Sequence, residues 1–177
     1  MSAETDRKFQ ETDRQFKETD RQFKETDRRL QEVSTLVGNL SGRWGEFVEG
    51  LVAPACETLF AQRGIPVHKV SRQVKAKLSG GRHMEIDVLV VNTTAVVLVE
   101  VKSRLTTEHV REQLVNVAEF REFFSEYADK QVFGAVAGIV IDENADRFAM
   151  KQGLFVIEQA GDTVRIANEE AFVPRAW

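Results

Sequence analysis

Residues 95–103 read AVVLVEVKS, five apolar residues followed by Glu100, Val101, Lys102 and Ser103. A run this apolar predicts a strand that is packed into a core. Successive side chains of a strand point to opposite faces, so Glu100 and Lys102 share a face. A surface salt bridge at the strand end is one interpretation, and it would contribute little to stability. The other is a functional site at the edge of the core.

A second acid precedes this strand. Residues 83–91, HMEIDVLVV, predict another strand, with His83, Glu85 and Asp87 on one face and Ile86, Val88 and Val90 on the other. A turn at residues 92–94 closes the two strands into an antiparallel hairpin. Twelve residues separate Asp87 from Glu100, which places both at similar distances from that turn. We therefore expect two carboxylates to converge beside Lys102.

Paired carboxylates at the edge of a core predict a bound cation. Two such groups repel each other unless they share a proton or a cation. Hard oxygen ligands suit Mg²⁺ or Mn²⁺, which keep waters and accept phosphate oxygens. Hydrolysis of a phosphodiester needs charge stabilisation at the phosphate and a nucleophilic water, and a carboxylate-bound divalent ion supplies both.

The rest of the chain predicts an α/β domain. A helical apolar face runs over residues 44–62, and an alternating strand covers residues 66–78 before the hairpin. Beyond the hairpin, the pattern indicates a helix capped by Thr106 or Thr107 and extending to residue 127, then a buried strand over residues 132–141. A short helix over 144–152 and a hairpin of 154–158 with 163–166 follow. The predicted order is α-β-β-β-α-β, then α-β-β.

Asp87, twelve intervening residues and Glu100-Val101-Lys102 in this element order resemble the PD-(D/E)XK nuclease superfamily, the restriction-endonuclease-like fold. Ile86 stands where the motif usually has proline. The resemblance covers roughly residues 42–141. The chain also resembles a bacterial group of this superfamily that carries a heptad tail before a helix containing Arg43-Trp44-Gly45.

The resemblance implies roles for individual residues. Asp87, Glu100 and the carbonyl of Val101 would be metal ligands, and Lys102 would orient or deprotonate the attacking water. The superfamily also tends to add an acid from the first helix, for which Glu46 and Glu49 are candidates. Glu49 flanks the apolar face of that helix, whereas Glu46 lies almost opposite, so Glu49 is preferred.

Two accessory positions are less specific. Gln113 matches a polar helix position found in some nucleases of the superfamily, but a solvated helix residue is the commoner interpretation. His83 shares the predicted face of Asp87 and is either a phosphate contact or an ordinary exposed histidine.

A basic stretch is the predicted nucleic-acid contact. Residues 62–83 contain no acid, and the basic residues assigned to nucleic acid there are Lys69, Arg72, Lys75, Lys77 and Arg82. Alternation would place Lys69, Ser71, Gln73, Lys75 and Lys77 on one strand face, opposite Val70, Val74 and Leu78. Such a face suits phosphates. The other interpretation is a solvated face that discourages edge pairing.

Residues 4–37 carry a seven-residue repeat that includes FKETDRQ. Phe9, Phe16, Phe23, Leu30 and Val37 occupy one seam position, and Thr or Val occupies the other, which predicts a coiled coil and homo-oligomerisation. Asn39, Ser41, Gly42 and Gly45 interrupt the repeat, although the apolar spacing resumes beyond them, so the helix continues or breaks there. We assign residues 1–40 to a coiled-coil oligomerisation helix and residues 41–177 to a nuclease-like domain.

Composition limits the class of protein. A net charge of −4 from 24 basic and 28 acidic residues argues against coating nucleic acid through bulk charge. No apolar run is long enough to cross a bilayer, no signal peptide is recognised, and the one cysteine, Cys56, allows no internal disulfide, which favours the cytoplasm. The function hypotheses are a metal-dependent nuclease acting on DNA or RNA, of which DNA is the favoured substrate, a non-catalytic nucleic-acid-binding scaffold of the same fold, and a coiled-coil adaptor.

Overall fold

The computed structural model describes the backbone of residues 3–177, and it describes side chains at residue 11 and in residues 14–33 and 50–177. The elements are α1 (Ala3–Ala61), β1 (Lys69–Lys77), the 3-10 turn η1 (Ser79–Gly81), β2 (His83–Val91), β3 (Ala95–Leu105), α2 (Thr107–Phe123), the 3-10 turn η2 (Ser125–Tyr127), β4 (Gln131–Ile141), α3 (Ala145–Lys151), β5 (Phe155–Ala160) and β6 (Thr163–Ile166). The predicted order of helices and strands is confirmed.

The strands of the described chain form one mixed sheet in the order β1-β2-β3-β4-β5-β6. β1, β2 and β3 pair antiparallel, as predicted, whereas β4 is parallel to both β3 and β5. At the turn between β2 and β3, Asn92 Oδ1 accepts hydrogen bonds from the N–H groups of Thr94 and Ala95 at 2.8 and 2.6 Å. The crossover from β3 to β4 contains α2, as a parallel connection requires.

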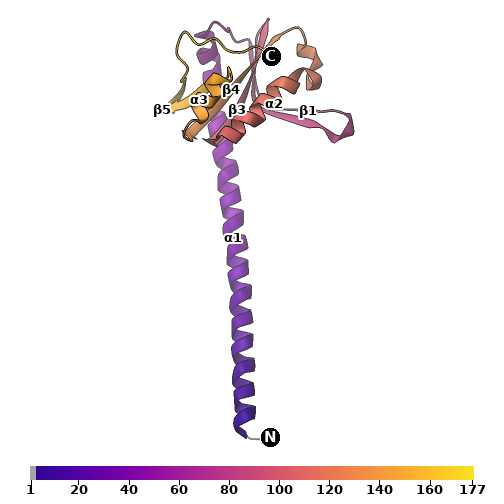
Figure 1. Cartoon of the computed structure of the whole chain (residues 1–177), viewed down its shortest axis with the longest axis vertical. Coiled ribbons are helices and arrows are strands. Elements are labelled where there is room, and N and C mark those ends of the chain that lie inside the picture. Colours follow the sequence, from indigo (N-terminus) through magenta and orange to yellow (C-terminus); the bar gives the residue numbers. More distant parts are fainter. Residues whose placement is uncertain (1–2) are drawn as a thin grey trace. The chain divides into compact units, whose positions relative to one another are not determined.

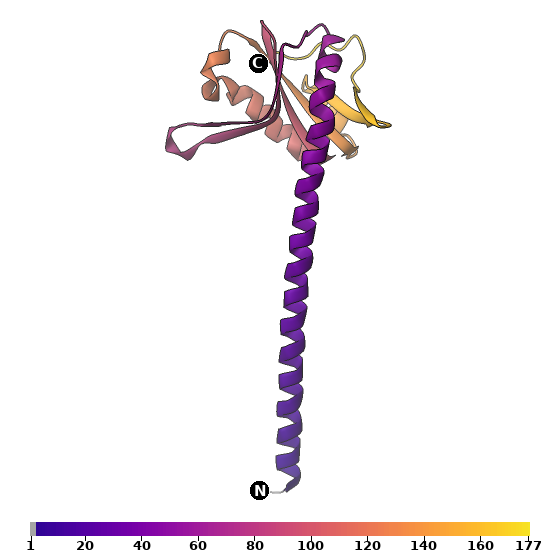
Figure 2. The same ribbon diagram turned by 180° about the vertical axis from the view of Figure 1, so that it is seen from behind.

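Helices cover both faces of the sheet. The end of α1 packs Val52, Cys56 and Phe60 on one face, against β3, β4 and β5. On the other face lie α2, through Phe120 and its neighbours, and α3. Figures 1 and 2 show α2 and the end of α1 on opposite sides of the sheet. Coverage on both faces explains why the sequences of β3 and β4 are almost uninterrupted apolar runs.

Local sequence sets the ends of the two main helices. After α1, Gly64 adopts φ +75° and the N–H of Ile65 donates to the carbonyl of Phe60 at 2.9 Å, which is a left-handed helix end that glycine permits. Thr106 caps α2 as predicted, because its hydroxyl accepts from the N–H of His109. His109 Nδ1 accepts from the N–H of Thr106 in return, at 3.2 Å.

The predicted alternation of β1 and β2 is wrong at one level of the sheet. Val88 and Val90 pack on the α1 face, but Met84 and Ile86 pack on the α2 face with Leu89. β1 reverses at the same level, because Val70 packs on the α1 face and Val74, Ala76 and Leu78 pack on the α2 face. Lys69 and Lys75 therefore do not share one continuous strand face as the alternation predicted. The reversal is centred on Gln73 and Asp87.

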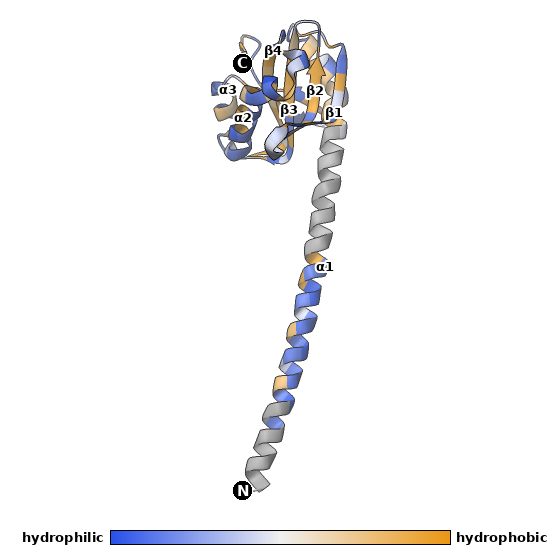
Figure 3. Cartoon of the chain, turned by 90° about the vertical axis from the view of Figure 1, so that its right-hand side faces the viewer, coloured by the Kyte–Doolittle hydropathy of each residue, from blue (hydrophilic) through white to orange (hydrophobic). Residues whose placement is uncertain are grey.

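The chain divides into two compact units between residues 43 and 44. α1 continues through residues 39–45, which is the continuation that the sequence left open. In the described part of the first unit, Phe16, Phe23 and Leu30 are 72%, 70% and 62% exposed. Figure 3 shows that this part of α1 is hydrophilic apart from separated hydrophobic positions. No helix among the described residues is long and apolar enough to cross a membrane.

Candidate active site

β2 and β3 separate at the level where the predicted site residues lie. Their pairing runs from Val91 with Val96 to Val88 with Val99 and stops there. The same register would set Asp87 opposite Glu100, but no pair forms. Beyond this level β2 stays with β1, and the two strands project from the rest of the sheet as a hairpin (Figure 1). The strand edges of β2 and β3 are thus unpaired with each other from Asp87 and Glu100 onward, and this break in the pairing is called the gap below.

The side chain of Asp87 gives β3 a hydrogen-bond partner at the level where β2 no longer pairs with it. Its Oδ2 accepts a hydrogen bond from the N–H of Val101 at 2.8 Å, across the gap. The side chain is half-buried, and this burial raises the pKa of its carboxyl group. The Val101 N–H and the charge of Lys102 lower that pKa by less, and the charge of Glu85 raises it further.

Glu100 is the more buried acid, with 9% of its surface exposed. Burial is the main reason that its carboxyl pKa is raised, and the charge of Asp87 is the second. A hydrogen bond and the charge of Lys102 oppose these effects without cancelling them. Two carboxyl groups that interact in this way favour neutralisation by a shared proton or a cation.

Lys102 lies on the same strand face as Glu100, as alternation predicted. Its Nζ is 2.5 Å from Glu100 Oε1, and a third of its side chain is exposed. Burial lowers the pKa of Lys102, but the hydrogen bond to Glu100 and the charges of Glu100, Asp87 and Glu112 raise it by more. The net shift of the Lys102 pKa is upward, because the acids around it stabilise the ammonium in the metal-free chain.

The donors around the gap fit a hard cation. Both backbone groups of a strand residue point to the same neighbouring strand, so the carbonyl of Val101 faces the gap together with its N–H. Two carboxylates and a carbonyl are a small set, which suits Mg²⁺ because that ion keeps several waters. Within the described part of the chain no cluster of three or more His, Cys, Asp or Glu side chains gathers as a metal site.

The two remaining predicted acids lie outside the described side chains. Glu46 and Glu49 belong to residues 34–49 of α1, whose side chains are not among those described. Glu112 was not predicted. It lies on α2, and its charge raises the pKa of both Glu100 and Lys102. No sequence signal identifies Glu112, because its proximity to β3 depends on how α2 packs on the sheet.

Gln113 is buried, so the interpretation as a solvated residue is wrong. Its amide nitrogen donates to the carbonyls of Leu98 and Ala135 at 2.8 and 3.1 Å. Gln113 thereby fastens α2 to β3 and β4, next to Glu112.

His83 is exposed in β2 and pairs with Lys77 on β1. That His83 and Asp87 share one strand face stays a prediction, because the reversal is centred on Asp87 itself.

The predicted nucleic-acid residues lie on β1 and at the tip of its hairpin, and all five have exposed side chains. Lys69, Arg72, Lys75 and Lys77 are exposed, and Lys75 Nζ is 3.1 Å from Glu85 on β2. Arg82 is engaged differently. Its guanidinium binds Glu119 and Glu122 of α2 at 3.1 and 2.9 Å and lies 5.1 Å from the ring centre of Phe123. Arg82 therefore fastens the hairpin to α2.

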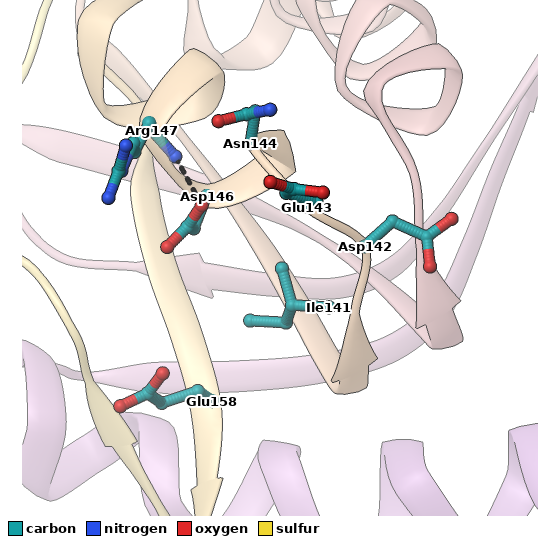
Figure 4. Close-up of a pocket in the computed structure, with 7 residues that line it drawn as sticks. All are labelled: Ile141, Asp142, Glu143, Asn144, Asp146, Arg147 and Glu158. Carbon is teal, nitrogen blue, oxygen red and sulfur yellow. Dashed lines mark hydrogen bonds between the residues drawn. The ribbon is translucent and has the colours of Figure 1, made fainter.

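A separate hollow lies at the carboxyl end of β4. It is lined by Ile141, Asp142, Glu143, Asn144, Asp146, Arg147 and Glu158, and Figure 4 shows their arrangement. Two of its acids have partners outside the hollow, since Asp142 pairs with Arg104 at 2.7 Å and Glu158 pairs with Arg165 at 2.6 Å. The hollow contains none of the residues predicted for the site.

No protein-family model and no curated protein matches the chain. Among solved structures, a repair endonuclease from Pyrococcus abyssi is similar with a TM-score of 0.44 and 20% identity over 63% of this chain and 46% of that chain. The structure of an EndoMS–dsDNA2 complex is similar with a TM-score of 0.40 and 23% identity over 63% of this chain and 44% of the other. This chain therefore spans less than half of either neighbour.

Proposed function

We propose that the chain is a Mg²⁺- or Mn²⁺-dependent nuclease that hydrolyses phosphodiester bonds in nucleic acid, with DNA preferred over RNA. The observation that supports it is the meeting of Asp87, Glu100 and Lys102 at the gap between β2 and β3. Structural charge pairs are normally placed in solvent, whereas this trio sits at the edge of the core with the pKa values of both acids raised.

Asp87, Glu100 and the carbonyl of Val101 would hold the ion, with Glu49 as a further candidate ligand. When bound, the ion supplies charge stabilisation at the scissile phosphate and a water that is acidic near neutral pH. Asp87 also holds the backbone of β3 in place through the Val101 N–H. The ammonium of Lys102 would orient the attacking water and stabilise negative charge as the oxygen of that water bonds to phosphorus and the bond from phosphorus to the leaving oxygen breaks. The water gives up its proton to solvent, and the leaving oxygen takes up a proton from solvent.

The β1–β2 hairpin supplies the proposed contact with nucleic acid. Lys69, Arg72, Lys75 and Lys77 follow an exposed strand that leads to the level of Asp87. Phosphate contacts of this kind fix a substrate's position without reading its sequence. Arg82, which the sequence also assigned to nucleic acid, serves the hairpin instead, because its guanidinium pairs with Glu119 and Glu122 of α2.

The N-terminal repeat supplies the proposed self-association. Its exposed Phe16, Phe23 and Leu30 recur every seven residues on α1. The hydroxyls of Thr19 and Thr26 donate to the carbonyls of Gln15 and Gln22 at 2.8 Å, so the other seam position presents satisfied side chains. Burying such an apolar stripe against other copies of the chain forms a coiled coil and brings two or more sites to one substrate.

The test is incubation of the full-length chain with supercoiled plasmid, linear duplex, single-stranded DNA and RNA, each with Mg²⁺ or Mn²⁺. We expect the wild type to cut DNA and the Asp87→Ala and Lys102→Ala variants to leave it intact. Binding of DNA by the wild type without any cutting would contradict the proposal and support the alternative of a non-catalytic nucleic-acid-binding scaffold. Neither binding nor cutting would support the adaptor.

A further inference from the structure

Gln73 has a backbone conformation that is unusual for its place. Its φ is +50°, although it lies inside the strand β1. Residues other than glycine rarely adopt this left-handed region, and asparagine and aspartate do so more readily than glutamine. Asn144, the other non-glycine residue of positive φ in the described chain, lies in a loop before α3. A strained backbone conformation inside a strand persists only where the surrounding structure holds it in place.

Gln73 lies directly across the hairpin from Asp87. β1 and β2 pair Arg72 with Val88 and Val74 with Ile86, but Gln73 and Asp87 form no pair. Both strands exchange their inward and outward faces at this level, as the packing of Val88 and Ile86 on opposite sides of the sheet shows. Both strands exchange faces at the same level and keep their register, so one irregularity accounts for both reversals. The residue with a left-handed backbone at that level is Gln73.

The break also determines where the Asp87 carboxylate lies. Without it, alternation would keep Asp87 on the same sheet face as Leu89, and β2 would continue along β3. With it, β2 leaves β3 after Val88 and the Asp87 carboxylate reaches the N–H of Val101. We propose that Gln73 is a positioning residue for the site: its left-handed backbone separates β2 from β3 and directs Asp87 into the gap.

Substitutions separate the backbone of Gln73 from its side chain. Glycine adopts positive φ without steric cost, so Gln73→Gly keeps the break while removing the whole side chain. Valine is β-branched and strongly disfavours positive φ, so Gln73→Val favours a regular strand. Gln73→Ala is a milder variant that lacks the branched side chain. The proposal predicts that Gln73→Gly behaves as the wild type and that Gln73→Val loses the separation of β2 from β3. Gln73→Ala should be intermediate.

The experiment is NMR of the contact between the Cα hydrogens of Asp87 and Glu100, measured on the metal-free, full-length chain. A β2–β3 ladder that continued past Val88 would set these two residues directly opposite each other, close enough for a strong nuclear Overhauser effect between those hydrogens. We expect this effect to be absent in the wild type and in Gln73→Gly and to appear in Gln73→Val. The amide of Ala135 in β4 reports whether the domain is folded in each variant. If Gln73→Val unfolds the domain, the comparison of Gln73→Ala with Gln73→Gly decides, because only the backbone account predicts the effect in Ala and not in Gly.

Absence of the Asp87–Glu100 contact in a folded Gln73→Val would overturn the proposal, and so would its equal appearance in the Gly and Val variants. The importance of Gln73 for catalysis rests on the proposed function. A Mn²⁺ titration of the same samples distinguishes a failure of the positioning role from a failure of the proposed function. If the Asp87–Glu100 contact follows the expected pattern while the wild type binds no Mn²⁺, the positioning role stands and the proposed function fails. If the wild type and Gln73→Gly bind Mn²⁺ and Gln73→Val binds at least about tenfold more weakly, both stand.

Discussion

At the scale of single residues, the raised pKa of Glu100 links the site to stability. A carboxyl group whose pKa is higher in the folded protein than in the unfolded chain favours folding when it is protonated. For Glu100 that contribution is complete below the unfolded value of about 4.3 and is lost as the pH rises through the higher folded pKa. Ionisation of Glu100 in the metal-free domain therefore costs stability, because burial disfavours the charge, and a bound cation would relieve this cost.

Replacing Glu100 with the neutral isostere should therefore stabilise the metal-free protein. We expect Glu100→Gln to raise Tm at pH 7.5, with the difference from wild type shrinking as the pH falls toward 4. Differential scanning calorimetry with EDTA measures it. Glu158→Gln, which alters an acid of the hollow at the end of β4, is the matched control. An unchanged or lower Tm for Glu100→Gln at pH 7.5 would show that the Lys102 ion pair outweighs the cost of burying the charge.

Lys102 should be needed for cleavage but not for folding or metal binding. We expect Lys102→Met to lose at least about a hundredfold in cleavage rate, the lower range for a residue that stabilises or moves charge in the transition state. Its affinity for Mn²⁺ should not fall, because the substitution removes a competing positive charge from Glu100. Lys151→Met, an exposed lysine on α3, is the control and should cut at the wild-type rate. A variant at Lys102 that still cuts normally would remove this residue from the mechanism.

At the scale of elements, the β1–β2 hairpin separates two kinds of basic residue. Lys77 is exposed and pairs in the ladder with His83, whereas Arg82 is bound to Glu119 and Glu122. We expect Lys77→Ala to weaken DNA binding at low salt and to reduce the slope of log K against log salt by about 1. Arg82→Ala should lower Tm and change that slope less. Fluorescence anisotropy at several salt concentrations measures both slopes, and a larger loss of slope for Arg82→Ala would reverse these assignments.

The sequence predicts elements better than it predicts their faces. Hydrophobic periodicity and the turn residues around 79–81 and 92–94 identify β2 and β3, and the register of their hairpin brings Asp87 toward Glu100. The reversal at Gln73 has no such local signal, because glutamine is an ordinary strand residue and its positive φ depends on the sheet around it. The burial of Gln113 was missed for the same reason, since α2 had to be docked before its amide found the carbonyls of Leu98 and Ala135.

At the scale of the whole molecule, the N-terminal repeat should determine the number of copies. Phe16 and Phe23 are exposed on α1, so their apolar surface is available to other chains. We expect Phe16→Ser combined with Phe23→Ser to shift the chain from an oligomer to a monomer in sedimentation experiments, because each Phe buries a large apolar surface in a coiled coil. Arg14→Ser combined with Arg21→Ser changes a different position of the repeat and should leave the mass unchanged. A wild-type chain that is monomeric at micromolar concentration would contradict this prediction.

The repeat predicts a helix and a seam from the sequence alone, but it does not fix the number of strands. Phenylalanine at one seam position and threonine at the other do not match the combinations that select two, three or four strands. Prediction of the metal ligand from α1 is limited for another reason. Choosing between Glu46 and Glu49 requires the rotation of α1 about its axis, which a helical wheel estimates only from the apolar residues around it.

The most direct test of the cation site is calorimetric titration of Mn²⁺ into the metal-free, full-length chain near pH 7.5. The account predicts about one ion per chain for the wild type, with at least about tenfold weaker binding by both Asp87→Asn and Glu100→Gln, variants that keep the shape of the side chains. Glu158→Gln should bind as the wild type does. Absence of Mn²⁺ binding by the wild type, or equal binding by all four proteins, would contradict the claim that Asp87 and Glu100 form a metal site.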